Sequence, residues 1–400
     1  MGFNVSDLQI TTATTSGVLQ ALGGFKFPSF TTATRPSSPS EGQAIYNTDI
    51  SALEVYDGSA WQEISSGGAF ATWAGESNRP SNPDDYTVGY NTTDNQIEVY
   101  DGTDWQTVGL GNPSSPLTAT GGNQTYEDNG WKYHVFTSDG TFTVSSGTDN
   151  IEYVIVAGGG GGGGGDVGAG GGAGGYRSNV PGFPSGGGAS AEAAMSISPG
   201  SYPVDVGNGG QGSASSPSDA DDGQDSSFNG ITSIGGGGGA SWGSGSGRTG
   251  GSGGGSVSTR TGASGTAGQG YDGASGRGGP HYPQGGGGGA GGPGQNARDN
   301  DNAGNGGIGL VNPFGRVTQV GEKLGNNSYW LAGGGGGGVE SNARVGRGGL
   351  GGGGIGGRQS PNTNPGSGIA NTGGGGGGED SGRGGSGGSG VVILRYKLPE

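Results

Sequence analysis

Uninterrupted glycine runs are the feature that most constrains what this chain can fold into. Glycine supplies 108 of the 400 residues, and the longest run, 158–165, is eight consecutive glycines. Glycine has no side chain to bury and loses more conformational freedom on folding than any other residue. The composition therefore excludes one large hydrophobic core and is typical of a disordered or low-complexity chain. An ordered fold needs some stabilising interaction other than apolar burial.

Glycine content and charge both change near residue 150. Residues 1–150 hold 18 glycines, 17 acidic and 4 basic residues, whereas residues 151–400 hold 90 glycines, 16 acidic and 13 basic residues. The strongly acidic first part argues against a nucleic-acid partner. The absence of cysteine excludes disulfides and thiolate metal sites. Two different structural parts are indicated.

An internal repeat organises the first part. The segment YNTDISALEVYDGSAWQEI at 46–64 recurs as YNTTDNQIEVYDGTDWQTV at 90–108, with ten identities in nineteen positions and an offset of 44 residues. Arg-Pro-Ser precedes both copies at the same offset, starting at Arg35 and Arg79. A fixed period of this kind indicates two copies of one structural unit.

Each copy predicts a small antiparallel meander. In the first copy, alternation over 53–56 puts Leu53 and Val55 on the face opposite Glu54 and Tyr56. An Asp-Gly turn follows, and a tryptophan (Trp61, or Trp105 in the second copy) opens the returning strand. So small a meander buries too little to be stable alone. A homotrimer that gathers the tryptophans around a shared axis is one solution; a tryptophan packed on its own hairpin in a monomer is the other.

Several conformations of the glycine runs can be compared. Collagen requires glycine at every third position, and calcium-binding Gly-Asp arrays require repeats that only residues 268–272 approach, so neither fits. A flexible linker remains an alternative. Polyglycine II is an extended left-handed helix with three residues per turn and no internal hydrogen bonds. Without Cβ atoms such helices can approach closely and satisfy one another's backbone groups. Runs of about six to eight residues would span roughly 19–25 Å, with the loops emerging at their ends.

We therefore expect a mainly β and irregular fold with almost no α-helix, in which β-meander repeats precede a polyglycine-II bundle flanked by short strands. The strand-like segments that lead into glycine runs are EYVIVA, ITSI, YWLA and IANT, and GVVILRYK ends the domain. A hairpin is expected around Asp139-Gly140. Residues 65–85 and 109–122 are expected to be connectors. The expected divisions are an N-terminal attachment segment (1–34), two meander repeats (35–66 and 79–110), a β-hairpin transition (123–157) and the glycine-rich domain (158–397).

These motifs resemble two groups of viral proteins. The motifs FTSDGTFTV, EYVIVAGGGGGGGG, AGGYR, SISPGSYPVDVGNGG and GGSGGSGVVILRYK, all within 131–397, resemble the glycine-rich domain of many phage tail fibres and adhesins. The YDGSAWQ repeats resemble segments of cyanophage tail-fibre proteins. The resemblance implies packed polyglycine-II helices that display receptor-binding loops on a virion.

Catalytic and metal-binding motifs are poorly represented. The only histidines, His134 and His281, lie far apart in the sequence, and no nucleotide-binding loop, zinc pattern or nucleophile elbow is present. The acidic loop 219–225 is compatible with a calcium site, or with glycan cleavage by the paired carboxylates of Asp221 and Asp222. The simpler interpretation is that these aspartates are solvated turn residues. We expect no enzyme activity and no cofactor.

Binding loops are better represented. After residue 150, 11 of the 13 basic residues are arginine, which offers a planar fork for sugar hydroxyls, carboxylates or phosphates. Several loops combine arginine with an aromatic ring, a combination suited to glycan recognition; the alternative is that the rings cap the glycine layers. The candidate receptor-binding residues are Tyr176, Arg177, Phe183, Trp242, Arg248, Tyr271, Arg277, His281, Tyr282, Phe314 and Arg316.

The sequence-based hypothesis is thus a non-enzymatic tail fibre or adhesin, located in the virion and binding no nucleic acid, in which the meander repeats form a fibre stalk and the loops contact a host cell-surface glycan or outer-membrane protein. Its N-terminal region would contact other tail or baseplate proteins. A purely structural virion fibre without receptor contact is the alternative.

Overall fold

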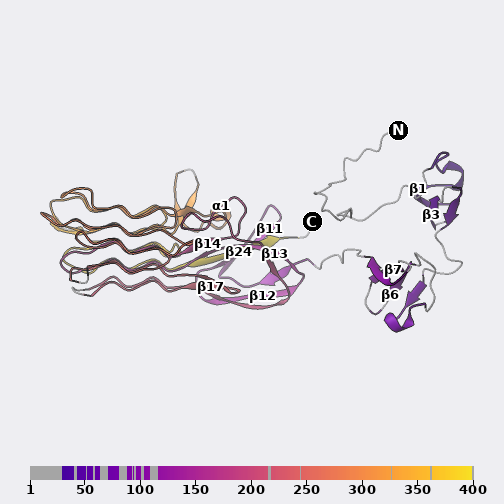
Figure 1. Ribbon diagram of the computed structural model, residues 1–400, viewed down its shortest axis with the longest axis horizontal. Helices are drawn as coiled ribbons and strands as arrows, with labels where there is room; N and C mark the ends of the chain where they lie inside the picture. The colour runs from indigo at the N-terminus through magenta and orange to yellow at the C-terminus, as the bar shows by residue number, and fades with distance from the viewer. Residues whose placement is uncertain are drawn as a thin grey trace. The chain divides into compact units, whose positions relative to one another are not determined.

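The computed structural model divides the chain into two compact units, residues 1–112 and 113–400, which are described separately (Figure 1). The described residues are 29–39, 43–50, 52–56, 59–63, 71–80, 88–91, 93, 96–100, 103–108, 116–214, 218–243, 245–325, 327–360 and 363–398. Across these ranges the fold is mainly β, as predicted, and α1 (Gly315–Thr318) is the one α-helix. No helix in these ranges is long and apolar enough to cross a membrane.

The first unit contains two four-stranded sheets of the same design. In each sheet the first strand runs parallel to the second, and the others form an antiparallel meander. The elements of the first sheet are β1 (Ser29–Phe30), a 3-10 turn (Thr32–Thr34), β2 (Ala44–Asn47), β3 (Ala52–Tyr56) and β4 (Trp61–Glu63). Those of the second are β5 (Ala71–Trp73), a 3-10 turn (Glu76–Asn78), β6 (Val88–Asn91), β7 (Gln96–Tyr100) and β8 (Trp105–Val108).

The predicted meanders are confirmed, and the returning strands begin at the two tryptophans. Each sheet begins earlier than expected, because β1 lies within the segment assigned to attachment and β5 lies within the segment 65–85 assigned to a connector. Both of these short strands add to the edge of the meander through β2 or β6. The Asp-Gly turns at 57–58 and 101–102 lie outside the described residues.

A buried ion pair stabilises each sheet. The buried carboxylate lies on the face that carries Glu54 and Tyr56 in the first sheet, and the alternation of apolar residues did not predict that this face is buried. Glu98 is 2% exposed and receives hydrogen bonds from Arg79, Nε to Oε2 at 2.9 Å and Nη2 to Oε1 at 2.6 Å. Asn91, which is fully buried, donates to the same carboxylate at 3.1 Å. In the first sheet, Glu54 accepts hydrogen bonds from Nη2 of Arg35 and from the side-chain amide of Asn47. A buried carboxylate requires such partners because burying an unpaired charge is costly.

Each tryptophan of the repeats contacts a ring of its own hairpin. Trp61 lies opposite Tyr56 with 5.6 Å between the ring centroids, and Trp105 lies opposite Tyr100 at the same distance. This arrangement matches the monomeric alternative for the packing of these side chains within one chain. Both tryptophans are only half-buried, so part of each side chain remains accessible.

The second unit begins with a β-sandwich. One sheet has the order β10-β11-β24-β13-β14, with β15 also paired to β13, and the other has the order β18-β17-β16-β12-β9. The C-terminal strand β24 lies between β11 and β13, so strands from the beginning and the end of this unit pair in one sheet. The strands are β9 (Thr118–Thr120), β10 (Gln124–Asp128), β11 (Trp131–Phe136), β12 (Gly140–Ser146), β13 (Asp149–Val156), β14 (Tyr176–Ser178), β15 (Met195–Ile197), β16 (Gly200–Asp205), β17 (Ser226–Phe228), β18 (Ile231–Ser233) and β24 (Val391–Lys397).

The expected hairpin around Asp139-Gly140 is wrong. Strands β11 and β12 belong to different sheets, and the Asp-Gly dipeptide turns the chain from one sheet to the other. The hairpin partner of β11 is β10, connected by Asn129 and Gly130, both with positive φ. An Asn-Gly dipeptide is a strong hairpin signal that our prediction did not use. Strand β9, within the expected connector 109–122, pairs with β12.

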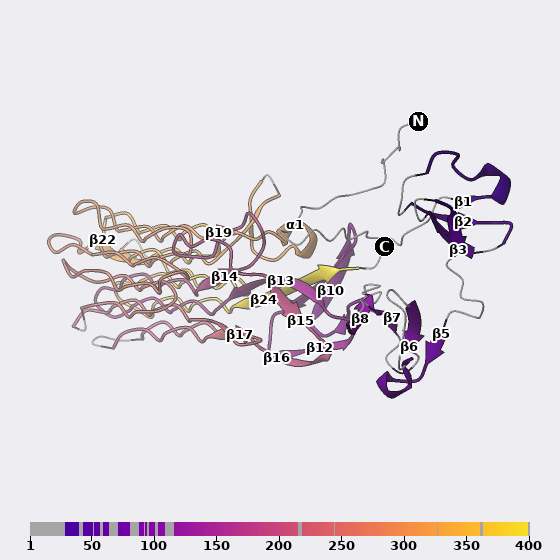
Figure 2. The same cartoon turned by 45° about the vertical axis from the view of Figure 1, so that its right-hand side comes forward.

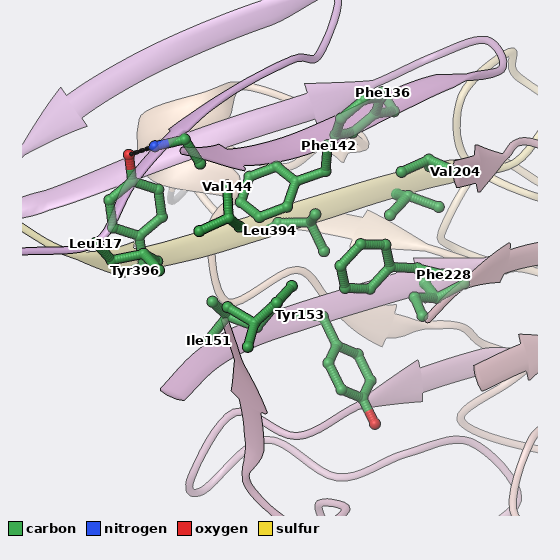
Figure 3. Close-up of a cluster of buried hydrophobic side chains, with 14 of the residues drawn as sticks. Leu117, Phe136, Phe142, Val144, Ile151, Tyr153, Val204, Phe228, Leu394 and Tyr396 are labelled. Atoms are coloured by element: carbon green, nitrogen blue, oxygen red, sulfur yellow. Dashed lines mark hydrogen bonds between the residues drawn. The ribbon is translucent and has the colours of Figure 1, made fainter. Parts of the chain in front are cut away.

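The sandwich has a side-chain core despite the glycine-rich composition. Figure 3 shows aromatic and aliphatic side chains from both sheets meeting between them, among them Phe142, Phe228, Leu394 and Tyr396. The phenol of Tyr396 accepts a hydrogen bond from the amide of Ala119 at 3.1 Å. Apolar burial is therefore concentrated in the sandwich and its flank, while the glycine runs depend on another interaction.

The opposite face of the β10–β14 sheet is also covered. A three-stranded sheet packs there with α1: its strands are β19 (Leu310–Val311), β20 (Glu322–Lys323) and β21 (Tyr329–Leu331), in the order β19-β21-β20. The expected strands EYVIVA, ITSI, YWLA and GVVILRYK are present as β13, β18, β21 and β24, whereas IANT forms a turn with Asn371 at positive φ. The two remaining strands, β22 (Val339–Ser341) and β23 (Arg358–Ser360), pair in parallel.

The glycine runs form extended helices whose hydrogen bonds repeat every third residue. In 158–163, the amides of Gly158 and Gly161 donate to Gln224 and Asp221 of one neighbour. The amides between them donate to two other segments of the chain: those of 159 and 162 to residues 388 and 385, and those of 160 and 163 to residues 172 and 169. A period of three with no bond inside the segment is the pattern of polyglycine II. The predicted bundle is confirmed.

The helix at 158–163 is surrounded on all sides. Its carbonyl groups accept hydrogen bonds from three further segments, with Gly236 and Gly239 in the first, Gly210 and Ser213 in the second, and Gly376 and Glu379 in the third. Six neighbouring segments thus satisfy one central helix, and the result is a lattice of backbone hydrogen bonds. Figures 1 and 2 show these segments running side by side away from the sandwich.

The lattice leaves no room for side chains at the glycine positions of its central helix. A Cβ atom added to Gly158, Gly160 or Gly162 would meet a backbone carbonyl oxygen of the next helix well inside 3.0 Å, a separation that real Cβ atoms essentially never show. Glycine is required there by the close approach of neighbouring backbones. The main-chain groups that side chains would otherwise separate are brought into hydrogen-bond range.

Candidate binding surface

The lattice has two ends, which we call the sandwich end and the distal end. The helices that follow β13, β18 and β21 run away from the sandwich, and the helices that lead into β14 and β24 return to it (Figure 2). The turns between outgoing and returning helices therefore gather at the distal end. Loops from distant parts of the sequence meet there, around Asp166, Trp242, Tyr282, Glu340 and Asp380.

Two exposed aromatic rings form the most prominent contact of the distal end. Trp242 is 39% exposed and Tyr282 is 37% exposed, and their ring centroids lie 5.5 Å apart with an interplanar angle of 79°. They come from two loops forty positions apart in the sequence. Both are candidate residues of the sequence analysis, which paired them with arginines in separate loops; the structure pairs the rings with each other.

The backbone beside Tyr282 is held in an uncommon conformation. His281 and Tyr282 both have positive φ, 69° and 35°, which costs free energy for residues other than glycine. Hydrogen bonds hold this segment: the amide of Tyr282 donates to Gly279 at 3.2 Å, and the amide of Glu340 donates to the carbonyl of His281 at 2.9 Å. The loop therefore presents the tyrosine ring in a defined position next to β22.

Carboxylates surround the aromatic pair. Asp166, Val167, Trp242, Tyr282 and Glu340 line a hollow of about 200 Å³. Asp380, which is 3% exposed, lies close to these carboxylates, and its pKa is raised to about 7 by burial first and then by the negative charges of Glu340, Glu379 and Asp166. Glu379 is also buried, and burial raises its pKa. This part of the distal end has a negative potential.

The basic candidate residues of this half of the lattice have polar partners. Arg248 binds Asp222 through two bonds, Nε to Oδ1 at 2.8 Å and Nη2 to Oδ2 at 2.7 Å, and this carboxylate raises the pKa of the guanidinium. Arg277 donates to Asn300 at 3.1 Å, and His281 lies 3.8 Å from Asp301. Arg248 and Arg277 are exposed and His281 is half-buried, so these side chains remain accessible in part.

The other candidate residues lie toward the sandwich end, and two of them are corrected. Tyr176 and Phe314 are buried in the core cluster beside the sheet, at 0% and 1% exposed, so they cannot serve as surface contacts. Tyr176 lies in β14 of this sheet, and Phe314 directly precedes α1, which packs on the same sheet. Phe183 packs partly against the same cluster, while Arg177 binds Glu192 at 2.6 Å and 2.9 Å and has a structural role. Two others, Tyr271 and Arg316, are half-buried and exposed respectively.

The acidic loop 219–225 supports the lattice. The Oδ1 atoms of Asp219, Asp222 and Asp225 accept the amides of residues 241, 238 and 235 at 3.1, 2.9 and 2.8 Å. The aspartates are three residues apart, as are the amides that they bind, and this spacing matches the three-residue turn of the helix. Each aspartate therefore accepts a hydrogen bond from one turn of the same neighbouring helix. Among the described residues, no group of three or more His, Asp or Glu side chains has the arrangement of a metal site. The cluster is thus explained by hydrogen bonding.

The other histidine, His134, is a core residue. His134 is fully buried between Phe142 and Tyr396, and its Nδ1 lies 2.7 Å from the carbonyl of Gly121, so this nitrogen donates. Nε2 is buried without a hydrogen-bond partner. Burial lowers the pKa of His134, with the bond to Gly121 acting in the opposite direction. His134 therefore has a structural role in the core of the sandwich.

The fold and its distal loops define a class of protein in which a glycine-backbone lattice, joined to a β-sandwich, displays loops at one end. Residues 137–397, more than half of the chain, match the family described as the glycine-rich domain, and the chain belongs to this family. A comparison with curated proteins finds no match.

Proposed function

We propose that the chain is a virion tail-fibre or adhesin protein whose distal loops bind a host cell-surface glycan or outer-membrane protein. The observation that supports this most directly is the pair of exposed rings, Trp242 and Tyr282, on loops that the lattice holds in place. Exposed aromatic side chains are enriched at binding surfaces, and a rigid support lowers the entropy lost on binding. The resemblance of the glycine motifs to phage adhesins agrees with this role.

The first unit would serve as the stalk. Its two sheets share one design, and their half-buried tryptophans leave ring surface for contacts with further copies. A homotrimer would supply three distal ends, and several weak contacts on one particle would add to a strong attachment. The N-terminal region would then join other tail or baseplate proteins.

The test is binding of the purified full chain to a panel of bacterial envelopes, cyanobacterial ones included. We expect binding to at least one envelope, and a loss of about tenfold or more in apparent affinity for the variant that combines Trp242→Ala with Tyr282→Ala. Leu324→Ala is the matched control, because this side chain is as exposed as Tyr282, at 37%, but directly follows β20, whose sheet packs on the sandwich.

Two outcomes would contradict the proposal. Equal binding of the double variant and the wild type would exclude the distal rings as the receptor contact. Absence of binding to every envelope, with the chain incorporated into a particle, would favour the alternative of a structural fibre. Mass measurement of the full chain in solution would decide separately between monomer and trimer.

A further inference from the structure

The hollow between Asp166, Val167, Trp242, Tyr282 and Glu340, here called the acidic hollow, has a chemistry that selects among glycans. Two of its side chains are exposed aromatic rings and two are exposed carboxylates. No arginine or lysine lines it. Its volume of about 200 Å³ is below the range of pockets for drug-sized ligands, so it suits one small ring or group.

Charge complementarity points to a cation. Aromatic faces attract ammonium groups through their negative quadrupole, and carboxylates bind them through charge-assisted hydrogen bonds. The buried Glu379 and Asp380 lie on the same side, but burial raises the pKa of both, that of Asp380 to about 7, so the exposed Asp166 and Glu340 are the carboxylates that would contact an ammonium group. An anionic sugar would be repelled by the same groups, and a neutral sugar would leave the carboxylates without a partner of opposite charge.

A metal ion is a poorer occupant. The described residues contain no group of three or more possible ligands with the arrangement of a metal site, and two of the side chains that line the hollow are rings rather than oxygen donors. Ions such as calcium need six to eight oxygen ligands. The rings add nothing to such a site, whereas they stack well on a sugar or an alkylammonium group.

We propose that the acidic hollow binds the protonated amine of an amino sugar, with the sugar ring against Trp242 and Tyr282 and the ammonium group near Asp166 and Glu340. This inference rests on the proposed function, because it names the kind of surface glycan that the distal loops would recognise. The strained backbone at His281 and Tyr282 fits a binding role, since it presents the ring at the edge of the hollow.

The experiment is calorimetric titration of the full chain with glucosamine, N-acetylglucosamine and glucose at pH 6.5. N-acetylglucosamine is the matched probe, because acetylation removes the charge and keeps the sugar ring. We expect millimolar binding of glucosamine and binding at least about tenfold weaker for the other two sugars, with added salt weakening the glucosamine complex. The double variant Asp166→Asn with Glu340→Gln should lose this preference.

A matched control is Glu127→Gln, which removes an exposed carboxylate on β10, far along the sequence from the distal loops. It should bind glucosamine like the wild type. Circular dichroism and melting curves report whether each variant is folded, and Trp242→Phe, which keeps a ring, provides a milder test that should retain part of the affinity.

Equal affinities for glucosamine and N-acetylglucosamine, no detectable binding of glucosamine, or an unchanged preference in the folded double variant would each overturn the inference. If the chain still binds bacterial envelopes in that case, only the assignment of the amine fails and the adhesin proposal stands. If envelope binding is also absent, both fail.

Discussion

A single methyl group inside the lattice provides the sharpest test of the structure. In Gly162, the amide donates to Gly385 at 2.8 Å and the carbonyl accepts from Ser213 at 3.1 Å. A Cβ atom at this position would meet the carbonyl oxygen of Gly377, which itself accepts the amide of Gly385 at 2.8 Å. The Gly162→Ala variant must therefore push one helix away from two neighbours.

The magnitude follows from the contacts that must change. Overpacking costs about 1–3 kcal/mol, and weakening one or two buried hydrogen bonds costs about 0.5–1.5 kcal/mol each. Alanine also restricts the unfolded chain, which returns about 0.4–1 kcal/mol. We expect a net loss of about 2–4 kcal/mol in the free energy of unfolding. For a unit of this size, Tm should fall by at least about 4 °C.

Gly278→Ala is the matched control for this prediction. No atom lies within 4 Å of a Cβ added at Gly278, and its φ is outside the left-handed region, so alanine fits without strain. This variant should be unchanged or slightly more stable, by about 0.4–1 kcal/mol. Scanning calorimetry of the full chain measures both. Equal melting temperatures for the two variants would refute the close-packed backbone lattice.

Three further predictions concern buried charges and protons. Glu98→Gln removes the charged partner of Arg79. It should lower the free energy of opening of β6 and β7 by on the order of 2–3 kcal/mol and so speed their amide hydrogen exchange. Exchange in β2 and β3 of the same chain provides the internal control. The pKa of His134 is lowered in the fold from 6.5, so stability should fall as pH drops below 6.5, by up to about 1.4 kcal/mol per pH unit; melting curves of His134→Gln should lose this part of the slope. The pKa of Asp380 is raised from 3.8 to about 7, so its contribution to stability is present below 3.8 and lost as pH rises through about 7. Denaturation at pH 8 should show Asp380→Asn more stable than the wild type by on the order of 2–4 kcal/mol, and denaturation at pH 4 should show little difference.

The sequence predicted the structure correctly where a residue type allows only one stable arrangement. Eight adjacent glycines cannot form a side-chain core, and their best way to satisfy backbone groups is contact with other glycine backbones. The repeat of 44 residues likewise predicted two equivalent meanders. The Asp139-Gly140 hairpin failed because the turn pattern cannot tell whether the next strand pairs with the previous one or crosses to a second sheet.

The candidate site was predicted only in part, for a related reason. Trp242 and Tyr282 were recognised as possible contacts because their loops combine an aromatic ring with arginine. Tyr176 and Phe314 also lie near an arginine in the sequence, but both are buried. The carboxylates of the acidic hollow, Glu340 among them, were missed. Their loops are far apart in the sequence and come together only through the order in which the helices pack.

The amino-acid sequence by itself determined which kinds of structure this protein forms. Runs without Cβ atoms allow backbones to approach to hydrogen-bond distance, and the short apolar strands between them form a sandwich. Tertiary structure decided which run lies beside which. Glycine backbones are chemically identical, so nothing in the runs themselves specifies that Gly158 donates to Gln224 while Gly159 donates to Gly388. That choice follows from the strands and loops at both ends, and it is also what brings two rings and two carboxylates together around one hollow.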